Sequence, residues 1–356
     1  YWDLIYSEQR LQGGFIWDWV DQAFLETNEQ GKNYWGYGGD YNEYIDGEPV
    51  NDGNFASNGV IQADRTPNPH AYQVRKTYQP VRFTMADPAS GAVEITNLYD
   101  FIGLDHLEFA FEVLRNGEPL TGESLVVNEI RPGESVVVQV PVSEYLEDPV
   151  NEYLLKVTAT QSSDEDPLIP AGHEVAWEQF ALTGMVDFTS VDPSGSGPAL
   201  AVNEMVEAVL IEGNQFALQF SRETGLMTSF ISGGIERIQH GITPNFWRLP
   251  TDNDRGAKLD ERLKVWNEAS LNQRLTGFDL KVTSEDVAVL TTTHELAGGV
   301  ANYTTRYTVS GDGSVRVKGS MELLNAELPM LPRFGVHLQM PRGFDQLTWY
   351  GRGPHE

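Results

Sequence analysis

The sequence contains no cysteine. Without thiols the chain can form no disulfide and no zinc–thiolate site, and it has no cysteine nucleophile, so any chemistry must come from other side chains. The absence of cysteine fits the cytoplasm and also many bacterial periplasmic proteins, so it leaves the compartment open.

Basic residues are scarce as well, because 24 Lys and Arg residues stand against 52 Asp and Glu residues. A protein that binds nucleic acid or an anionic membrane needs a positively charged surface, so we expect neither as a partner. The net negative charge favours neutral or cationic ligands. A solvated acidic surface without any ligand explains the charge equally well.

Long hydrophobic runs are also missing, since none approaches the roughly 18 residues that a membrane-spanning helix needs. The chain opens on Tyr1 rather than on methionine, so the lack of a signal peptide carries no information if this is an excised piece. What is present, 40% hydrophobic and 21% charged residues over 356 positions, is typical of a folded protein with two or three domains.

The first residues predict part of an α/β domain. Tyr1, Trp2 and Tyr6 share one side of a helix, and Gly13-Gly14 leads from it into "FIWDWV", a run that is apolar on both faces. A helix, a short loop and such a run are typical of a buried parallel strand. Towards residue 78 the sequence becomes rich in Gly, Asn, Asp and aromatic residues, which predicts an ordered loop region.

From Val81 the hydrophobic period changes to two, which is typical of strands. Asn116-Gly117 between two such runs is a strong signal for a two-residue hairpin turn. The alternation predicts an immunoglobulin-like β-sandwich, followed by a linker rich in Ser, Pro and Gly. The expected strands are residues 81–87, 92–97, 107–117, 124–130, 135–141, 153–159 and 174–182.

A second β-rich region begins near Ala201. Hairpins are expected around Gly213-Asn214 and around Gly311-Asp312-Gly313, with a short amphipathic helix over residues 260–270 between them. This region predicts a larger β-sandwich, and the sequence stops at Glu356 without a closing strand.

Candidate chemistry gathers after the first apolar run, where Trp17, Asp18, Trp19, Asp21 and Gln22 follow in order. In a (β/α)₈ barrel, catalytic side chains lie at the carboxyl ends of the strands. Aromatic residues at such a mouth stack on the apolar faces of sugar rings. The alternative is a core strand whose aspartates cap the next turn.

Several strings together resemble one enzyme family, the large β-galactosidases of the glycoside hydrolase family 2 type. They are "LQGGFIWDWVDQ", "YWGYGGDY", "NDGNFASNGV", "ADRTPNPHAYQVRKTYQPV", "NFWRLPTDNDRG" and "LTWYGRGPHE". The resemblance covers nearly the whole chain in order, although residues 81–201 match by architecture rather than by motif.

The resemblance implies a mainly β, multidomain C-terminal fragment of such an enzyme. The expected divisions are the C-terminal part of a catalytic TIM barrel at 1–78, an immunoglobulin-like β-sandwich at 79–185, a linker at 186–200 and a truncated large C-terminal β-sandwich at 201–356.

The resemblance also implies retaining hydrolysis of terminal β-D-galactose residues. That reaction uses two glutamates about 5–5.5 Å apart. In family members both precede the "GGFIWDWVDQ" segment, so we expect no catalytic residue in this chain and no activity from the chain alone. Implied partners are a galactoside substrate, the remainder of the same polypeptide and further copies in a homo-oligomer.

Four site residues carry over by resemblance. Trp17 matches a tryptophan that lines the galactose pocket. Phe55, through its backbone carbonyl, and Asn58, through its side-chain oxygen, match ligands of an active-site sodium ion, and Asn58 should also lie near a sugar hydroxyl. Asn51 matches a position associated with magnesium, although "NDGNF" departs from the family pattern around it. Oxygen ligands suit such hard cations.

Other interpretations stay open. A related exo-β-glycosidase, such as a β-glucuronidase or a β-mannosidase, is disfavoured by the large region after Ala201, and a non-catalytic carbohydrate-binding or assembly module is an alternative of another class. Residues 251–256, "TDNDRG", could bind a cation or bond to their own backbone. His70 is interpreted as structural.

Overall fold

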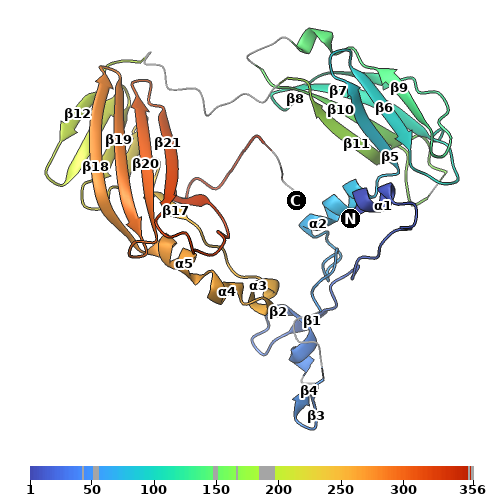
Figure 1. The fold of residues 1–356 in the computed structure, drawn as a ribbon, viewed down its shortest axis with the longest axis horizontal. Helices are drawn as coiled ribbons and strands as arrows, with labels where there is room; N and C mark the ends of the chain where they lie inside the picture. The colour runs from blue at the N-terminus through green and yellow to red at the C-terminus, as the bar shows by residue number, and fades with distance from the viewer. Residues whose placement is uncertain are drawn as a thin grey trace. The chain divides into compact units, whose positions relative to one another are not determined.

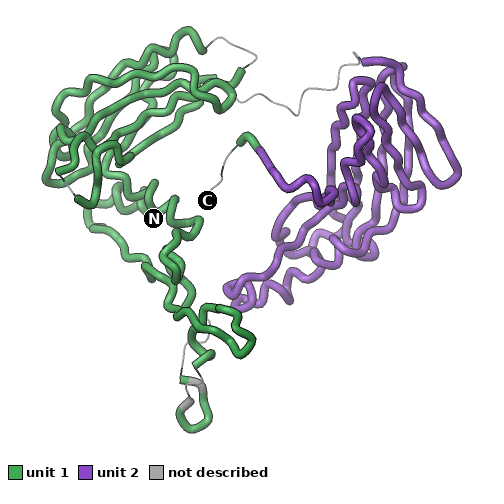
Figure 2. Tube along the Cα trace, turned by 180° about the vertical axis from the view of Figure 1, so that it is seen from behind, with its two compact units in different colours: residues 1–187, 349–356 green, residues 188–348 purple. Residues whose placement is uncertain are grey.

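The computed structural model describes residues 1–41, 44–50, 56–146, 151–165, 167–183, 197–351 and 353 (Figure 1). It contains two compact units, one of residues 1–187 with 349–356 and one of residues 188–348 (Figure 2). Strands dominate both units, so the expected mainly β fold class is confirmed. Within the described ranges no helix is long and apolar enough to cross a membrane.

The N-terminal region of the first unit has little regular structure. Two short antiparallel pairs join β1 to β2 and β3 to β4, and a helix lies at each end of the region. The elements are α1 (Trp2–Ser7), β1 (Phe24–Thr27), β2 (Asn33–Gly36), β3 (Tyr44–Ile45), β4 (Glu48–Pro49) and α2 (Pro69–Thr77).

The prediction of a buried strand at "FIWDWV" was wrong. Residues 15–20 form no strand, Phe15 is fully exposed, and only Val20 makes a parallel bridge, to Ile61. A parallel strand is buried when neighbours pair with both of its edges and helices cover its faces. Among the described residues, only the segment around Ile61 runs beside this stretch.

The rest of the first unit is a β-sandwich. A three-stranded sheet has the order β5-β6-β9, and a four-stranded sheet has the order β11-β10-β7-β8. Alternate residues of both sheets point inward and form one core, with Ile95, Val113 and Leu155 fully buried. The strands are β5 (Val81–Asp87), β6 (Ala92–Asn97), β7 (Leu107–Arg115), β8 (Glu118–Leu125), β9 (Ser135–Gln139), β10 (Tyr153–Gln161) and β11 (Glu174–Ala181).

One strand of this sandwich lies elsewhere than predicted. The expected strand at 124–130 is mostly loop, and β8 instead spans Glu118–Leu125. The reason is the predicted turn at Asn116-Gly117, because a two-residue turn makes the returning strand start at once, with Glu118 opposite Arg115. Most of β8 is exposed and polar, so it lacks the apolar alternation that marks a strand in the sequence.

Helix α2 is attached to β11 of the sandwich, beside the end of β5 (Figure 1). The Arg75 guanidinium donates to the Glu174 carbonyl at 2.6 Å. The Lys76 ammonium donates to the carboxylate of Glu178 at 3.0 Å and lies 4.2 Å from the ring centroid of Trp177. These contacts join the end of the N-terminal region to the sandwich.

The second unit contains a five-stranded sheet, β12-β13-β14-β15-β16, and a four-stranded sheet, β18-β19-β20-β21. Their facing sides share a core that includes Ile211, Phe220, Leu290 and Tyr307, and Figure 1 shows one sheet behind the other. The strands are β12 (Ala201–Glu204), β13 (Ala208–Gly213), β14 (Phe216–Ser221), β15 (Met227–Ser232), β16 (Ile235–Glu236), β18 (Gln273–Ser284), β19 (Val287–Leu296), β20 (Ala301–Ser310) and β21 (Val315–Leu323).

A smaller layer closes one end of this unit. Strands β17 (His240–Asn245) and β22 (Gly335–Gln339) pair with each other, and three helices follow β17. The buried Trp266 anchors this layer, because its indole N–H lies 3.0 Å from the carbonyls of both Pro329 and Met330. The helices are α3 (Asp252–Gly256), α4 (Leu259–Arg262) and α5 (Lys264–Leu271).

Candidate functional site

Two segments distant in sequence run side by side in the N-terminal region. The Val60 amide donates to the Asp18 carbonyl at 3.0 Å, the Ile61 amide to the Trp19 carbonyl at 2.9 Å, and the Asp21 amide to the Ile61 carbonyl at 2.9 Å. This ladder brings the segment that follows Trp17 beside the segment that contains Asn58. The structure therefore places the segments of Trp17 and Asn58, two residues nominated by the resemblance, side by side.

The nominated residues differ in exposure. Trp17 is 78% exposed, so within the described structure its ring is not core filling. Asn58 is half-buried, and its carbonyl accepts from the Asp18 amide at 3.4 Å. The other two nominated residues, Phe55 and Asn51, lie outside the described residues.

Two oxygen atoms beside this ladder are buried without a hydrogen-bond partner in the described structure. They are Oδ1 of Asp18 and Oδ1 of Asn58. The second carboxylate oxygen of Asp18 accepts from the side-chain amide of Gln22. Buried polar atoms normally have partners, and a hard cation takes carboxylate and amide oxygens as ligands, so this donor set fits such an ion.

Both backbone polar groups of Gly59, the residue directly after Asn58, are hydrogen-bonded. Its N–H donates to Oδ1 of Asp21 at 2.7 Å, and its carbonyl accepts from the side-chain amide of Asn68 at 2.8 Å. The Nε2 atom of His70 lies 3.2 Å from the same carbonyl. The sequence suggested a structural role for His70 but did not single out Asn68, because nothing in the local pattern reveals a contact with a residue nine positions earlier.

In the "TDNDRG" segment, polar side chains form hydrogen bonds with the backbone of the same segment. Asp254 accepts from the Thr251 amide at 2.9 Å, and Thr251 Oγ1 accepts from the Asp254 amide at 3.2 Å, which is a capping box at the start of α3. The Thr251 amide and hydroxyl hold the pKa of Asp254 below its usual value, and the ion pair with Arg248 at 2.7 Å lowers that pKa further. These bonds support the interpretation that this segment bonds to its own backbone.

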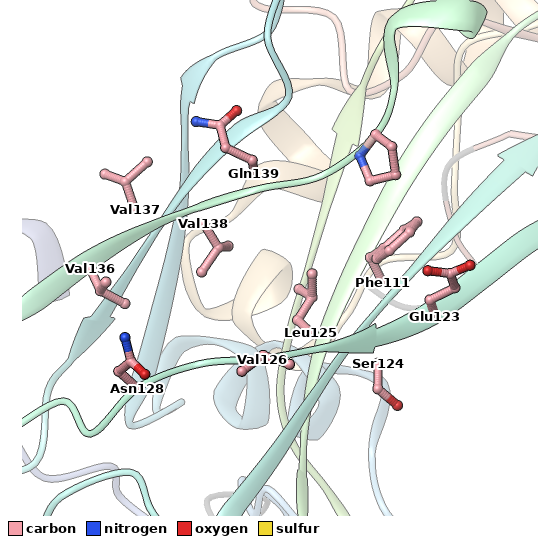
Figure 3. A pocket seen from close by; sticks show the side chains of 11 residues that line it. Phe111, Glu123, Ser124, Leu125, Val126, Asn128, Val136, Val137, Val138 and Gln139 are labelled. Atoms are coloured by element: carbon pink, nitrogen blue, oxygen red, sulfur yellow. The ribbon is translucent and has the colours of Figure 1, made fainter.

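A pocket of about 400 Å³ opens in the sandwich between the end of β8 and β9 (Figure 3). Its lining includes Leu125, Val126, Val136 and Val138, and Glu123 is the one ionisable side chain in it. None of the nominated residues contributes to it. Ser124, Asn128 and Gln139 add further hydrogen-bonding groups to the lining.

Comparisons with known proteins complete the assignment. A family model described as "Glycosyl hydrolases family 2, TIM barrel domain" matches residues 1–83. A model for "Beta-galactosidase, domain 4" matches residues 93–183, and one for "Beta galactosidase small chain" matches residues 212–356. The chain belongs to glycoside hydrolase family 2.

Three relatives each match the whole of this family 2 chain. A β-galactosidase of Priestia megaterium is 37% identical over 360 residues, which are 100% of the chain and 34% of the relative. One from Vibrio cholerae is 33% identical over 373 residues, and one from Halalkalibacterium halodurans is 30% identical over 361 residues, each covering 100% of the chain and 34% of the relative. The chain therefore spans about a third of the length of the curated relatives it matches.

Proposed function

We propose that this chain is the C-terminal part of a retaining β-galactosidase that removes terminal, non-reducing β-D-galactose residues. One observation carries the proposal: the similarity runs through all of the chain and reaches proteins that are each named β-galactosidase. The three family models follow along the chain in the order expected for such an enzyme.

In this proposal the chain binds and orients the sugar rather than cleaving the bond. Retaining hydrolysis needs one carboxylate to attack the anomeric carbon and a second carboxyl group to protonate the leaving oxygen. We assign both to the part of the enzyme that lies outside this chain. Trp17 offers its exposed ring as a flat apolar platform for a galactose ring, and Asn58 offers an amide near a sugar hydroxyl.

We further propose that Asn58 Oδ1 and the backbone carbonyl of Phe55 bind a sodium ion, and that Asn51 contributes to a magnesium site. The unpartnered buried oxygens of Asn58 and Asp18 support an oxygen-ligand site at this position. When bound, such an ion supplies a fixed positive charge that attracts hydroxyl oxygens of the sugar.

The sodium role of Asn58 is tested in the full-length enzyme by Asn58→Ala. We expect the preference of galactoside hydrolysis for sodium over potassium to be lost, because a coordinating oxygen is gone. Phe55→Leu should have a smaller effect, because its ligand is a backbone carbonyl. An unchanged sodium preference in Asn58→Ala would remove this assignment.

Substrate class separates the proposal from its enzymatic rivals. The full-length enzyme should hydrolyse nitrophenyl β-galactoside with retention, seen by NMR of the first anomer released, and should act poorly on the matching glucuronide and mannoside. Sugar binding without turnover by the full-length protein would favour the non-catalytic module instead.

The domain divisions at residues 78, 185 and 200 and the homo-oligomeric state also remain proposals. Limited proteolysis followed by mass spectrometry would locate the divisions, and light scattering of the full-length enzyme would give the number of subunits.

A further inference from the structure

We propose that Asp21, Asn68 and His70 are positioning residues that fix the backbone N–H and carbonyl of Gly59 and thereby help to aim the Asn58 side chain. We call these three residues the Gly59 clamp. The proposal rests on the proposed function of Asn58 and adds to it the residues that would make that function possible.

No hydrogen bond from the described residues orients the side-chain oxygen of Asn58. Its Oδ1 is buried and has no partner among the described residues. An amide that has to meet a ligand must nevertheless point in one direction, because an unrestrained rotamer costs binding free energy when it is fixed. The direction in which this side chain leaves the main chain is set by the backbone at Asn58.

The backbone of Gly59, directly after Asn58, is hydrogen-bonded through both its N–H and its carbonyl. The carboxylate of Asp21 accepts the Gly59 N–H at 2.7 Å, which is a charge-assisted hydrogen bond. On the other side, the amide of Asn68 donates to the Gly59 carbonyl at 2.8 Å, and His70 Nε2 lies 3.2 Å from the same oxygen. Rotation of the peptide group before Gly59 would break the bond to Asp21, and rotation of the one after it would break the bond from Asn68.

The surroundings of Gly59 leave no room for a side chain. Gly59 is buried, and a Cβ atom at this position would lie 2.2 Å from the amide nitrogen of Asp21 and 2.4 Å from the carbonyl carbon of Val20. Such distances are impossible without backbone movement, so the peptide lies directly on the segment that follows Trp17. Only glycine allows this approach. The clamp thus relates Asn58 to the segment of Trp17 through backbone contacts.

The test uses the full-length enzyme and the variants Asp21→Ala, Asp21→Asn and Asn68→Ala. Asp64→Ala is the matched control, because Asp64 also accepts a backbone N–H, that of Thr66 at 2.9 Å, but does not touch Gly59. The first measurement is the sodium concentration that gives half of the maximal thermal stabilisation when NaCl replaces KCl at constant ionic strength. The second is hydrogen exchange of the peptide that covers residues 56–61.

We expect Asp21→Ala and Asn68→Ala to raise the half-stabilising sodium concentration about tenfold, as the loss of residues that hold ligands typically does. Exchange at residues 56–61 should accelerate in both variants. Asp21→Asn keeps an oxygen that can accept the Gly59 N–H and should restore most of the effect. Asp64→Ala should change the sodium concentration by no more than about twofold.

The outcomes separate this inference from the proposed function. If Asn58→Ala abolishes sodium stabilisation while Asp21→Ala and Asn68→Ala leave the half-stabilising concentration unchanged, the clamp is overturned and the role of Asn58 stands. If Asn58→Ala itself keeps full sodium stabilisation, the ion role falls and the clamp loses its purpose. Melting temperatures in KCl alone report whether each variant is folded.

Discussion

Trp17 and Trp19 are two exposed tryptophans separated by one residue, with 78% and 68% of their surfaces accessible. Aromatic rings such as these can stack on the apolar faces of sugar rings. The resemblance to the family assigns a sugar contact to Trp17 but none to Trp19. This difference makes the pair an internal comparison for single-residue experiments.

We expect Trp17→Ala in the full-length enzyme to lower kcat/KM for a nitrophenyl galactoside by about 100-fold, because loss of a positioning surface misplaces the reacting sugar. The melting temperature should change little. Trp19→Ala is the matched control and should retain most of the activity. A loss of stability that accounts for the whole loss of activity would refute the platform role.

The sequence could predict only those site residues that stand in a local motif. Trp17 and Asn58 were found because each stands in a recognisable string. The bond between Asp21 and Gly59 joins residues 38 positions apart, and no periodicity or turn rule encodes such a pair. It is visible only once the two segments lie side by side.

Among the elements, those with buried alternation were predicted best. Strands β5 and β6 have the predicted bounds, because a strand with one buried face alternates apolar and polar residues. Strand β8 was misplaced because it is exposed. The expected strand at 15–20 failed because apolar content alone does not create hydrogen-bonding neighbours.

The end of strand β6 depends on one buried side chain. Asn97 is fully buried, and its amide nitrogen donates to the carbonyls of Ile102 at 2.9 Å and Ile130 at 3.0 Å. Its side-chain oxygen accepts from the Tyr99 amide at 2.8 Å. These bonds organise the two loops that cross this end of the sandwich.

Asn97→Ala should therefore lower the free energy of unfolding of the sandwich by about 2–4 kcal/mol, because backbone groups lose their partner. Urea unfolding measures the loss. Thr96→Ala is the control, since the Thr96 hydroxyl makes an exposed bond with Ser135 at 2.9 Å, and it should cost no more than about 1 kcal/mol. Equal costs for both variants would contradict the structural role of Asn97.

Glu236 organises the hairpin of β15 and β16 in the second unit. Its carboxylate accepts from the Phe230 amide at 2.8 Å and from the Ser229 hydroxyl at 2.5 Å. Burial acts to raise the pKa of Glu236, but the hydrogen bonds from Ser229, Phe230 and Ile238 outweigh it and leave that pKa below its ordinary value of 4.5. A lowered pKa in the folded state stabilises the fold above pH 4.5, and this contribution is lost as the pH falls through the folded-state value.

Glu236→Gln should therefore lower the melting temperature at pH 7. The difference from the parent should shrink as the pH falls from 4.5 through the lower folded-state pKa, where the parent carboxylate becomes protonated. Thermal melts across this range measure the effect. Glu223→Gln, at an exposed position, is the control for the substitution itself. A constant difference at all pH values would show that the charge of Glu236 is irrelevant.

For the molecule as a whole, we expect the purified chain to release no nitrophenol from nitrophenyl β-galactoside. Retaining hydrolysis requires two carboxyl groups on a rigid scaffold, and the family places both before the first residue of this chain. Adding the complementary N-terminal part of the enzyme should restore turnover if the two parts associate. Activity of the chain alone would mean that the catalytic pair lies within these residues.

The attachment of α2 to β11 has a practical consequence for where a polypeptide can be cut. Gln79 is buried between the helix and β5, and its side-chain oxygen accepts from the Trp177 amide at 3.3 Å. A gene shortened to begin at Val81 would discard this residue together with Arg75 and Lys76. A gene that begins at Asn68 keeps α2 packed on the sandwich. Its recombinant product should be more soluble than the product of the gene that begins at Val81.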